Sequence, residues 1–227
     1  MVDGAITAGD GLESERWSDR VHAGTRLGEA VRARLGTDQS ALVIGLPRGG
    51  VVVGAEVARA LVAPLDVWLV RKIGMPGQEE LGLGAIAEGG YVTYSNEIVR
   101  GAGISRERLL RLTRKKAVEL ERRTRILRGD RRPPVIADRT VVLVDDGIAT
   151  GGTVRAAAEA LRAQKPRRLV LAVPVVAADT LAVLSALFDE TVALAVPQSL
   201  RAVGLWYDDF GQVDDDEVME RLAAART

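Results

Sequence analysis

Apolar runs alternate with stretches of helical periodicity along most of the chain. Short apolar runs bounded by glycine, proline or charge are typical of buried strands, and apolar positions three and four residues apart are typical of helices. The predicted strands are 41–46, 66–70, 140–144, 168–173 and 191–196. The predicted helices are 18–35 (with Ser18 as its cap), 51–61, 105–127, 153–164, 178–187 and 215–225. This alternation predicts an α/β fold with a mainly parallel, doubly wound, five-stranded sheet.

Three segments fall outside the alternation. Residues 73–95 are rich in glycine, which disfavours a helix, so we expect a long flexible loop with a hairpin near Ala85 and 91–94. Residues 197–211 show no clear period. Residues 1–14 are glycine-rich and polar, and we expect them to be disordered. The chain shows no internal repeat, so residues 15–227 form one domain in this interpretation.

Composition removes several classes of chemistry. The 227 residues contain no cysteine and one histidine, His22, which excludes thiol nucleophiles and argues against a histidine metal cage or a Ser-His-Asp triad. Lys+Arg and Asp+Glu both number 31, and this balance argues against a dedicated nucleic-acid binder. No apolar run reaches membrane-spanning length and residues 1–11 lack the features of a secretory signal, so we expect a cytoplasmic protein without membrane partners.

The densest chemical signal lies at residues 141–153. Four apolar residues are followed by Asp145 and Asp146, then by the turn 150–153 (Thr-Gly-Gly-Thr) and an alanine-rich helix. Ligands of open α/β sheets bind at the carboxyl ends of strands. The turn's N–H groups can hold a phosphate, and the two carboxylates can hold sugar hydroxyls or a hard cation. The competing interpretation is an ordinary strand–helix turn with polar capping residues.

This thirteen-residue run resembles the signature of the type I phosphoribosyltransferases, which use phosphoribosyl pyrophosphate (PRPP). The resemblance implies that Asp145 and Asp146 hold the ribose hydroxyls and Mg²⁺ at the catalytic centre. It implies that the 5-phosphate binds at the turn formed by Ala149, Thr150, Gly151, Gly152 and Thr153. Four further segments extend the resemblance over residues 17–223 to a group of predicted bacterial phosphoribosyltransferases without an assigned acceptor. They are Asp19-Arg20, 46–50, 70–74 and 202–207.

Two of these segments resemble the family's pyrophosphate-binding elements. Arg48, Gly49 and Gly50 follow the first strand, in a loop that often carries a cis peptide, here Pro47–Arg48. Arg71 and Lys72 stand where adenine-specific members begin a flexible catalytic loop. The alternatives are an ordinary turn for the first segment and a solvated charge pair for the second.

The sequence indicates the residues that would bind the acceptor base less specifically. Trp206 and Tyr207 lie where the family forms a hood over the base, and an aromatic ring there can stack on it; equally, aromatic residues pin irregular segments to a core. Members that act on 6-oxopurines carry an aspartate at the position of Ala149, and this departure argues against such a substrate. Adenine-specific members use a loop glutamate as the base. Glu88 is the candidate, Glu79 and Glu80 are rivals, and a solvated loop glutamate is the ordinary alternative.

These features predict a pentosyltransferase of nucleotide salvage. It would transfer ribose 5-phosphate from PRPP, with Mg²⁺, to a purine, adenine-like or pyrimidine base and release pyrophosphate. The alternative is a non-catalytic regulator that senses PRPP or nucleotides and could also bind RNA, because residues 100–132 carry thirteen Lys/Arg against four Asp/Glu. The acidic stretch 208–220 is a candidate to meet that basic stretch across a homodimer. A PRPP synthetase relative is disfavoured because no Walker motif is present.

Overall fold

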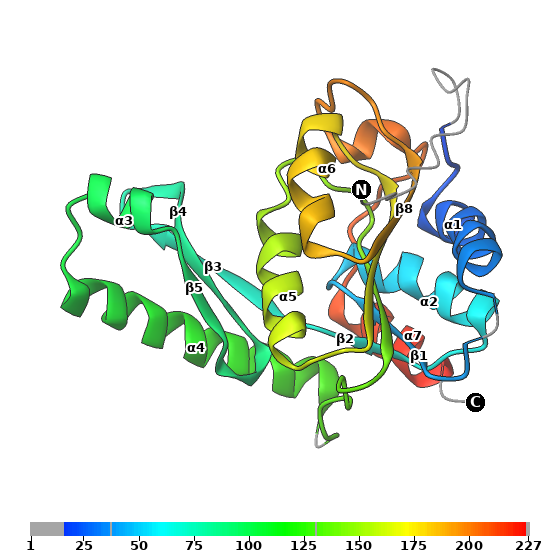
Figure 1. Cartoon of the computed structure of the whole chain (residues 1–227), viewed down its shortest axis with the longest axis horizontal. Coiled ribbons are helices and arrows are strands. Elements are labelled where there is room, and N and C mark those ends of the chain that lie inside the picture. Colours follow the sequence, from blue (N-terminus) through cyan, green and yellow to red (C-terminus); the bar gives the residue numbers. More distant parts are fainter. Residues whose placement is uncertain (1–15, 37, 130, 226–227) are drawn as a thin grey trace.

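The computed structural model describes residues 16–36, 38–129 and 131–225, and a five-stranded parallel sheet forms its centre (Figure 1). The strand order is β2-β1-β6-β7-β8, and every neighbouring pair is parallel. The strands are β1 (Ala41–Gly45), β2 (Leu65–Val67), β6 (Thr140–Val144), β7 (Arg168–Val175) and β8 (Glu190–Ala195). The predicted doubly wound α/β sheet is confirmed. The expectation for residues 1–14 lies outside the described residues.

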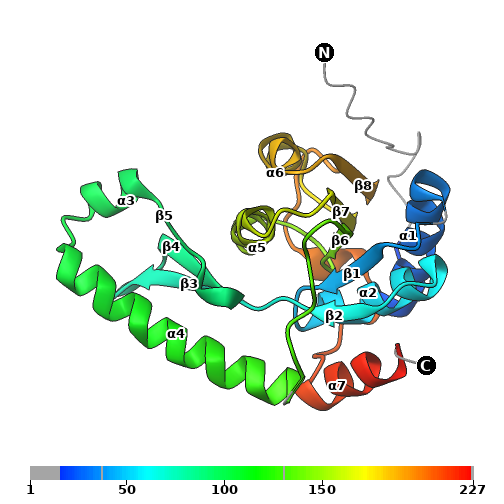
Figure 2. The same cartoon turned by 60° about the horizontal axis from the view of Figure 1, so that its bottom comes forward.

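Helices cover both faces of the sheet, which explains why its strands are apolar throughout. Val141 and Leu143 of β6 join the core under α5 and α6, whereas Val142 and Val144 join the core under α1, α2 and α7. Figure 2 shows these two groups of helices on opposite sides of the sheet. The helices are α1 (Arg20–Leu35), α2 (Gly49–Leu61), α5 (Gly152–Ala163), α6 (Ala178–Leu184) and α7 (Asp215–Ala224).

An arm projects from one side of this body, where the sequence predicted a long flexible loop with a hairpin (Figure 1). A three-stranded antiparallel sheet forms it, with α3 and the long helix α4 alongside. The bounds are β3 (Val70–Met75), β4 (Gln78–Ala87), a 3₁₀ turn η1 (Glu88–Gly90), β5 (Val92–Tyr94), α3 (Asn96–Gly101) and α4 (Arg106–Arg128). The helix predicted at 105–127 is therefore confirmed.

The prediction of a loop over 73–95 is wrong because it took the glycines as breakers of regular structure. The hairpin predicted near Ala85 and 91–94 is confirmed, because Ala85 of β4 pairs with Thr93 of β5 in an antiparallel ladder. Ile73 and Leu83 are completely buried and pack with Leu109 of α4 in a small core of the arm. A side chain at Gly84 would overlap the Thr93 carbonyl of the neighbouring strand, so this glycine allows close strand approach. The glycines thus serve sheet packing rather than irregular structure.

The segment 197–211 is irregular as expected, apart from the 3₁₀ turn η3 (Val203–Trp206), and a second such turn, η2 (Ser185–Leu187), follows α6. Trp17 forms an isolated parallel bridge with Tyr207, which brings the start of the described chain against this segment. The cap of α1 is Asp19 rather than Ser18, because the Asp19 carboxylate accepts the His22 N–H. No helix in the described part of the chain is long and apolar enough to cross a membrane.

Candidate functional site

The turn after β6 is shaped by its neighbours before any ligand is considered. Ile148 N–H donates to the Val175 carbonyl at 2.8 Å, and the Thr180 hydroxyl donates to the Ala149 carbonyl at 2.6 Å. Gly151 then adopts φ +70, a conformation that strongly favours glycine, and a side chain there would crowd Thr180. The turn is therefore held open by β7 and α6.

Gly152 begins α5 and presents its backbone to open space. A Cβ at this position would meet no atom within 4 Å, and the Gly151 cap supplies no side-chain hydrogen bond to the helix. The first N–H groups of a helix have no intrahelical partner and attract anions. Thr150, Gly152 and Thr153 line a cavity of about 270 Å³ between α5 and the arm. The turn thus has the form of a phosphate cradle.

Asp146 is held in place from three directions. Arg20 Nε of α1 donates to Asp146 Oδ2 at 2.7 Å, and the Tyr207 hydroxyl donates to the Asp146 carbonyl at 2.5 Å. A side chain at Gly49 would overlap the Asp146 carboxylate, so α2 begins directly against it. Sequence reasoning did not single out Arg20 as a site residue. Its position beside Asp19, in a pair already noted for the family resemblance, was the signal for it.

Asp145 lies in a different environment from its neighbour, since no described side chain donates a hydrogen bond to its carboxylate as Arg20 does to Asp146. Burial, with a further contribution from the charge of Asp146, raises the pKa of the Asp145 carboxyl well above its ordinary value. The Asp146 N–H donates to Asp145 Oδ1 at 3.0 Å, and a Cβ at Gly50 would lie only 2.9 Å from the Asp145 Cα. The two carboxylates therefore differ in environment although they are adjacent in sequence.

Arginines line a second cavity, of about 340 Å³, beside the first. Arg48, Arg71 and Arg123 contribute to its wall, and Thr153 lines both cavities. The Pro47–Arg48 peptide bond is cis, as the family resemblance implied. Burial, with a further contribution from the charge of the nearby Arg123, lowers the pKa of Arg71. The predicted grouping of Arg48 with Arg71 is therefore realised at one site.

Lys72 does not join Arg48 and Arg71. Successive residues of a strand point to opposite faces, and Lys72 lines the cavity that contains Thr150 and Thr153 instead. The adjacent cations of the sequence thus serve two cavities, with Lys72 on the side of the phosphate cradle.

Glu88 does not occupy the position expected of a catalytic base. Its carboxylate forms an ion pair with Arg128, both side chains are nearly inaccessible to solvent, and Glu88 lines neither cavity. Its N–H donates to the Leu69 carbonyl at 2.9 Å, which places it at the root of the arm. The structure therefore contradicts the role predicted for Glu88. The side chains of its rivals Glu79 and Glu80 lie outside the described part of the structure.

The aromatic residues of the C-terminal segment pack against one another. Tyr207 is 2% exposed, and its ring centroid lies 5.4 Å from that of Trp17 and 5.0 Å from that of Phe210. Burial raises the pKa of the Tyr207 hydroxyl. The ring centroid of Trp206 lies 5.9 Å from that of Trp17. Tyr207 therefore pins the segment to the core, and the prediction that it stacks on a base is wrong; the same role for Trp206 stays a prediction.

The geometry defines an α/β domain with an open glycine turn at the start of a helix and paired carboxylates at the carboxyl edge of its parallel sheet. Comparison with known proteins gives the family. The model of the phosphoribosyl transferase domain matches residues 22–193, most of the chain, and the chain belongs to this family.

Two relatives come from Mycobacterium tuberculosis strains H37Rv and CDC 1551, and both are provisionally named phosphoribosyl transferases. Each is 43% identical over 210 residues, which cover 92% of this chain and 47% of the relative. The chain thus spans about half the length of the curated relatives it matches. The crystal structure of TT1426 from Thermus thermophilus is 44% identical, with a TM-score of 0.81 over 92% of this chain and 98% of that one.

Proposed function

We propose that this chain transfers the 5-phosphoribosyl group of PRPP to a nitrogen of an acceptor base. The bond from the anomeric carbon to the pyrophosphate oxygen breaks, and a bond from that carbon to the acceptor nitrogen forms. Pyrophosphate leaves with the electron pair, and the acceptor nitrogen gives up a proton. The observation that carries the proposal is that one strand end presents Asp145, Asp146 and the phosphate cradle beside an arginine-lined cavity.

Each part of PRPP has a matching feature in this arrangement. The 5-phosphate fits the uncapped N–H groups of the turn 150–153. The ribose hydroxyls fit Asp145 and Asp146, of which Asp146 is oriented by Arg20. The pyrophosphate fits the cavity of Arg48 and Arg71, where guanidinium groups would stabilise charge as it develops on the leaving oxygen.

The donor set is compatible with Mg²⁺ bound together with the substrate. Within the described residues, no group of three or more Asp, Glu, His or Cys forms a closed metal cage. Mg²⁺ commonly takes one or two carboxylates and fills its remaining positions with water and substrate phosphates. Asp145 and Asp146 would supply those carboxylates, and the bound ion would neutralise charge on the leaving group.

The acceptor class we propose is an adenine-like purine or a pyrimidine. Ala149 occupies the position of the aspartate that members acting on 6-oxopurines carry. Glu88 forms an ion pair with Arg128, so it does not supply a catalytic base in its place. A screen of purines, pyrimidines and their analogues with PRPP and Mg²⁺, scored by pyrophosphate release, tests this proposal. Release with one class of base supports it, and Asp146→Asn should abolish that release. No release with any base counts against a transferase.

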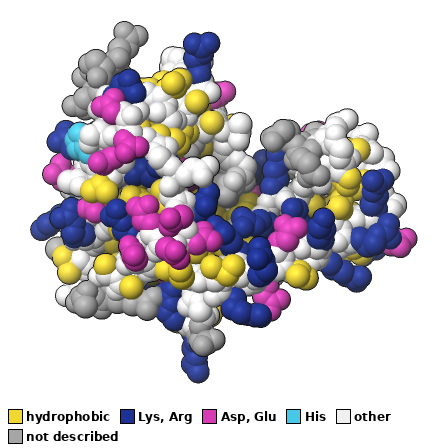
Figure 3. All heavy atoms as spheres, turned by 180° about the vertical axis from the view of Figure 1, so that it is seen from behind, with side chains coloured by type: hydrophobic (Ala, Val, Ile, Leu, Met, Phe, Trp, Pro, Cys, Tyr) yellow, Lys and Arg dark blue, Asp and Glu magenta, His cyan; other side chains and the backbone are white. Residues whose placement is uncertain are grey.

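A second function is favoured by the charge of the arm. Helix α4 carries ten Lys/Arg against three Glu, and Figure 3 shows Lys and Arg side chains gathered over the arm on the rear face. A regulator that senses PRPP or a nucleotide could use this surface to bind RNA. RNA binding that weakens steeply with salt, with no pyrophosphate release from any base, would favour the regulator. A homodimer stays a prediction for either function.

A further inference from the structure

The arginine-lined cavity contains a residue that no sequence motif indicated. Arg48 comes from the loop after β1 and Arg71 from the root of β3, whereas Arg123 comes from the core end of α4. The cavity therefore forms where the loop, the arm's first strand and the arm's long helix converge. Its described lining residues include three arginines and no aspartate or glutamate. They are Leu46, Pro47, Arg48, Trp68, Leu69, Val70, Arg71, Arg123 and Thr153.

Arg123 is held by a carboxylate from the far end of the chain. Its Nη1 donates to Asp215 Oδ2 at 2.6 Å, its Nη2 donates to Asp215 Oδ1, and both side chains are about three-quarters buried. Asp215 is the first residue of α7, which packs against α4. The acidic stretch 208–220 therefore meets the basic stretch 100–132 within one chain.

This pairing leaves Arg123 able to bind a second anion. A guanidinium has five N–H donors in a rigid fork, and Asp215 occupies one on each of the two terminal nitrogens. Three donors remain for a ligand in the cavity. The bidentate contact also fixes the plane of the fork, which lowers the entropy cost of a further hydrogen bond.

The balance of charged residues around the cavity favours the binding of such an anion. Burial and then the charge of Arg123 lower the pKa of Arg71, while the carboxylates of Glu119 and Asp215 raise it. Glu119 is itself paired with Lys116 at 2.9 Å, and Asp215 with Arg123. Those two carboxylates are thus already engaged by other cations. A bound diphosphate would supply negative charge to balance the three arginines.

We propose that Arg123 is a third cation for the pyrophosphate group of PRPP, and that Asp215 is the residue that positions it. The inference rests on the proposed function and extends it to two residues outside the family's motifs. It makes the start of α7, near the C-terminal end of the chain, part of the support of the leaving-group site.

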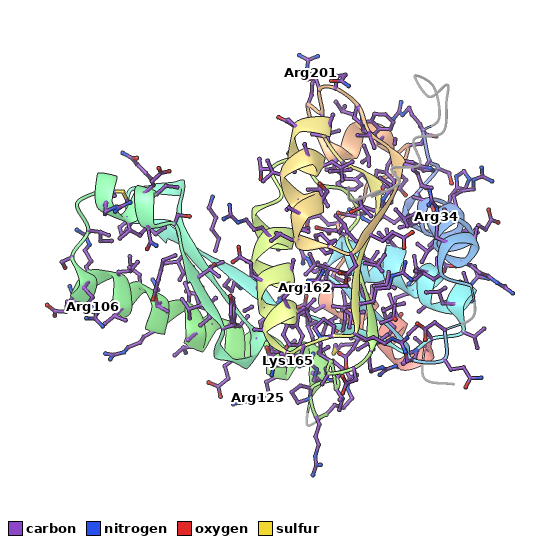
Figure 4. All side chains as sticks on the ribbon, viewed as in Figure 1. Arg34, Arg106, Arg125, Arg162, Lys165 and Arg201 are labelled. Carbon is purple, nitrogen blue, oxygen red and sulfur yellow. The ribbon has the colours of Figure 1, made fainter. Side chains whose placement is uncertain are left out.

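The test compares Arg123→Gln with a matched control on the same helix. Arg125 lies near the core end of α4 (Figure 4), is 73% exposed and pairs with the equally exposed Glu121, so Arg125→Gln is the control. Calorimetry measures the Kd of inorganic pyrophosphate with Mg²⁺ and, separately, the Kd of ribose 5-phosphate. Arg123→Gln should weaken pyrophosphate about tenfold, the size of a lost charge-assisted hydrogen bond, and leave ribose 5-phosphate within about twofold.

Asp215→Asn distinguishes positioning from packing. It should weaken pyrophosphate in the native chain but have no further effect when Arg123 is already glutamine, since the two residues act as one unit. Arg123→Lys should restore only part of the affinity because lysine lacks the planar fork.

Pyrophosphate affinity that Arg123→Gln leaves unchanged in a folded protein would overturn this inference while leaving the proposed function intact. Equal weakening of both ligands would assign Arg123 a purely structural role and would also overturn it. If the native chain binds neither pyrophosphate nor PRPP, the proposed function fails first.

Discussion

Glu88 and Arg128 form an ion pair almost wholly withdrawn from solvent, with side-chain exposures of 8% and 1%. Arg128 also contacts Asp66 Oδ1 at 3.2 Å and donates to the Val67 carbonyl at 2.7 Å. The guanidinium therefore joins the end of α4 to both β2 and the root of the arm. A glutamate in this position supports the arm rather than exchanging protons with a substrate.

Glu88→Gln should lower the stability of the fold and leave the turnover nearly unchanged. The variant removes one of the two carboxylates that face the buried Arg128 and leaves Asp66 as its remaining partner, so we expect the free energy of unfolding to fall by about 1–3 kcal/mol. Turnover per folded molecule should change less than about twofold, because a buried residue outside the site contributes no transition-state contact. Denaturant unfolding and pyrophosphate release measure the two effects.

The control for this variant is Glu107→Gln, since Glu107 lies on the same arm, pairs with Arg111 and is 83% exposed. Exposed ion pairs contribute little, so its stability should stay within about 0.5 kcal/mol of the native value. A Glu88→Gln protein with native stability and abolished turnover would restore Glu88 as the catalytic base.

The two glycines of the phosphate cradle should respond differently to alanine. Gly152→Ala adds a methyl group to open space, so the fold should be retained while PRPP binding weakens about tenfold through lost access to the backbone N–H groups. Gly151→Ala places a side chain at φ +70 against Thr180, and should lower stability by about 1–2 kcal/mol or more. Thermal melting and PRPP titration separate the two effects. Loss of stability in Gly152→Ala with unchanged PRPP affinity would contradict this assignment.

The central sheet was predictable because burial on both faces leaves a plain mark on the sequence. Strands such as β6 are apolar at every position after the first, and the helices between them keep a clear period. The arm was not predictable in the same way. Its strands are stabilised by a small separate core around Ile73 and Leu83, and its glycines are explained only by the close approach of a partner strand that no local pattern specifies.

Arg20→Gln should impair the site through Asp146. The native guanidinium holds Asp146 Oδ2, donates to the Gly211 carbonyl at 2.9 Å and lies 3.8 Å from the Phe210 ring centroid. Without it, Asp146 can rotate away from the ribose position, and kcat/KM for PRPP should fall about tenfold. The comparison is Arg26→Gln on the same helix, where Arg26 is 55% exposed and pairs only loosely with Glu29. Equal rates for the two variants would remove Arg20 from the site.

Asp145→Asn should make the ligand-free protein less sensitive to pH. The folded pKa of Asp145 is raised above its ordinary 3.8, so its contribution to stability is full below that value and is lost as pH rises through the folded pKa. Asparagine does not ionise, so the variant does not lose this stability as the pH rises. The gain in melting temperature of the variant over the native protein should therefore grow as the pH is raised above about 4. A gain that shrinks over this range would mean that Asp145 is stabilised as a carboxylate.

For the site, as for the fold, some features could be predicted from the sequence and others could not. The residues of the turn 149–153 and the pair Asp145–Asp146 are contiguous in sequence, and their spacing alone indicated an anion site. Arg20 and Arg123 reach the site from helices distant in sequence, and only the packing of α1, α4 and α7 brings them there. Conversely, Glu88 and Tyr207 were judged by residue type and rough position, while their burial decides their role.

The central claim is that the turn after β6 and its two aspartates bind PRPP. Calorimetric titration of PRPP with Mg²⁺ into the native chain and into an Asp146→Asn, Gly152→Ala double variant tests it most directly. We predict saturable binding at one site per native chain, and affinity reduced by about a hundredfold in a double variant that stays folded. Undetectable binding by the native chain, or equal affinity in the two proteins, would contradict the claim.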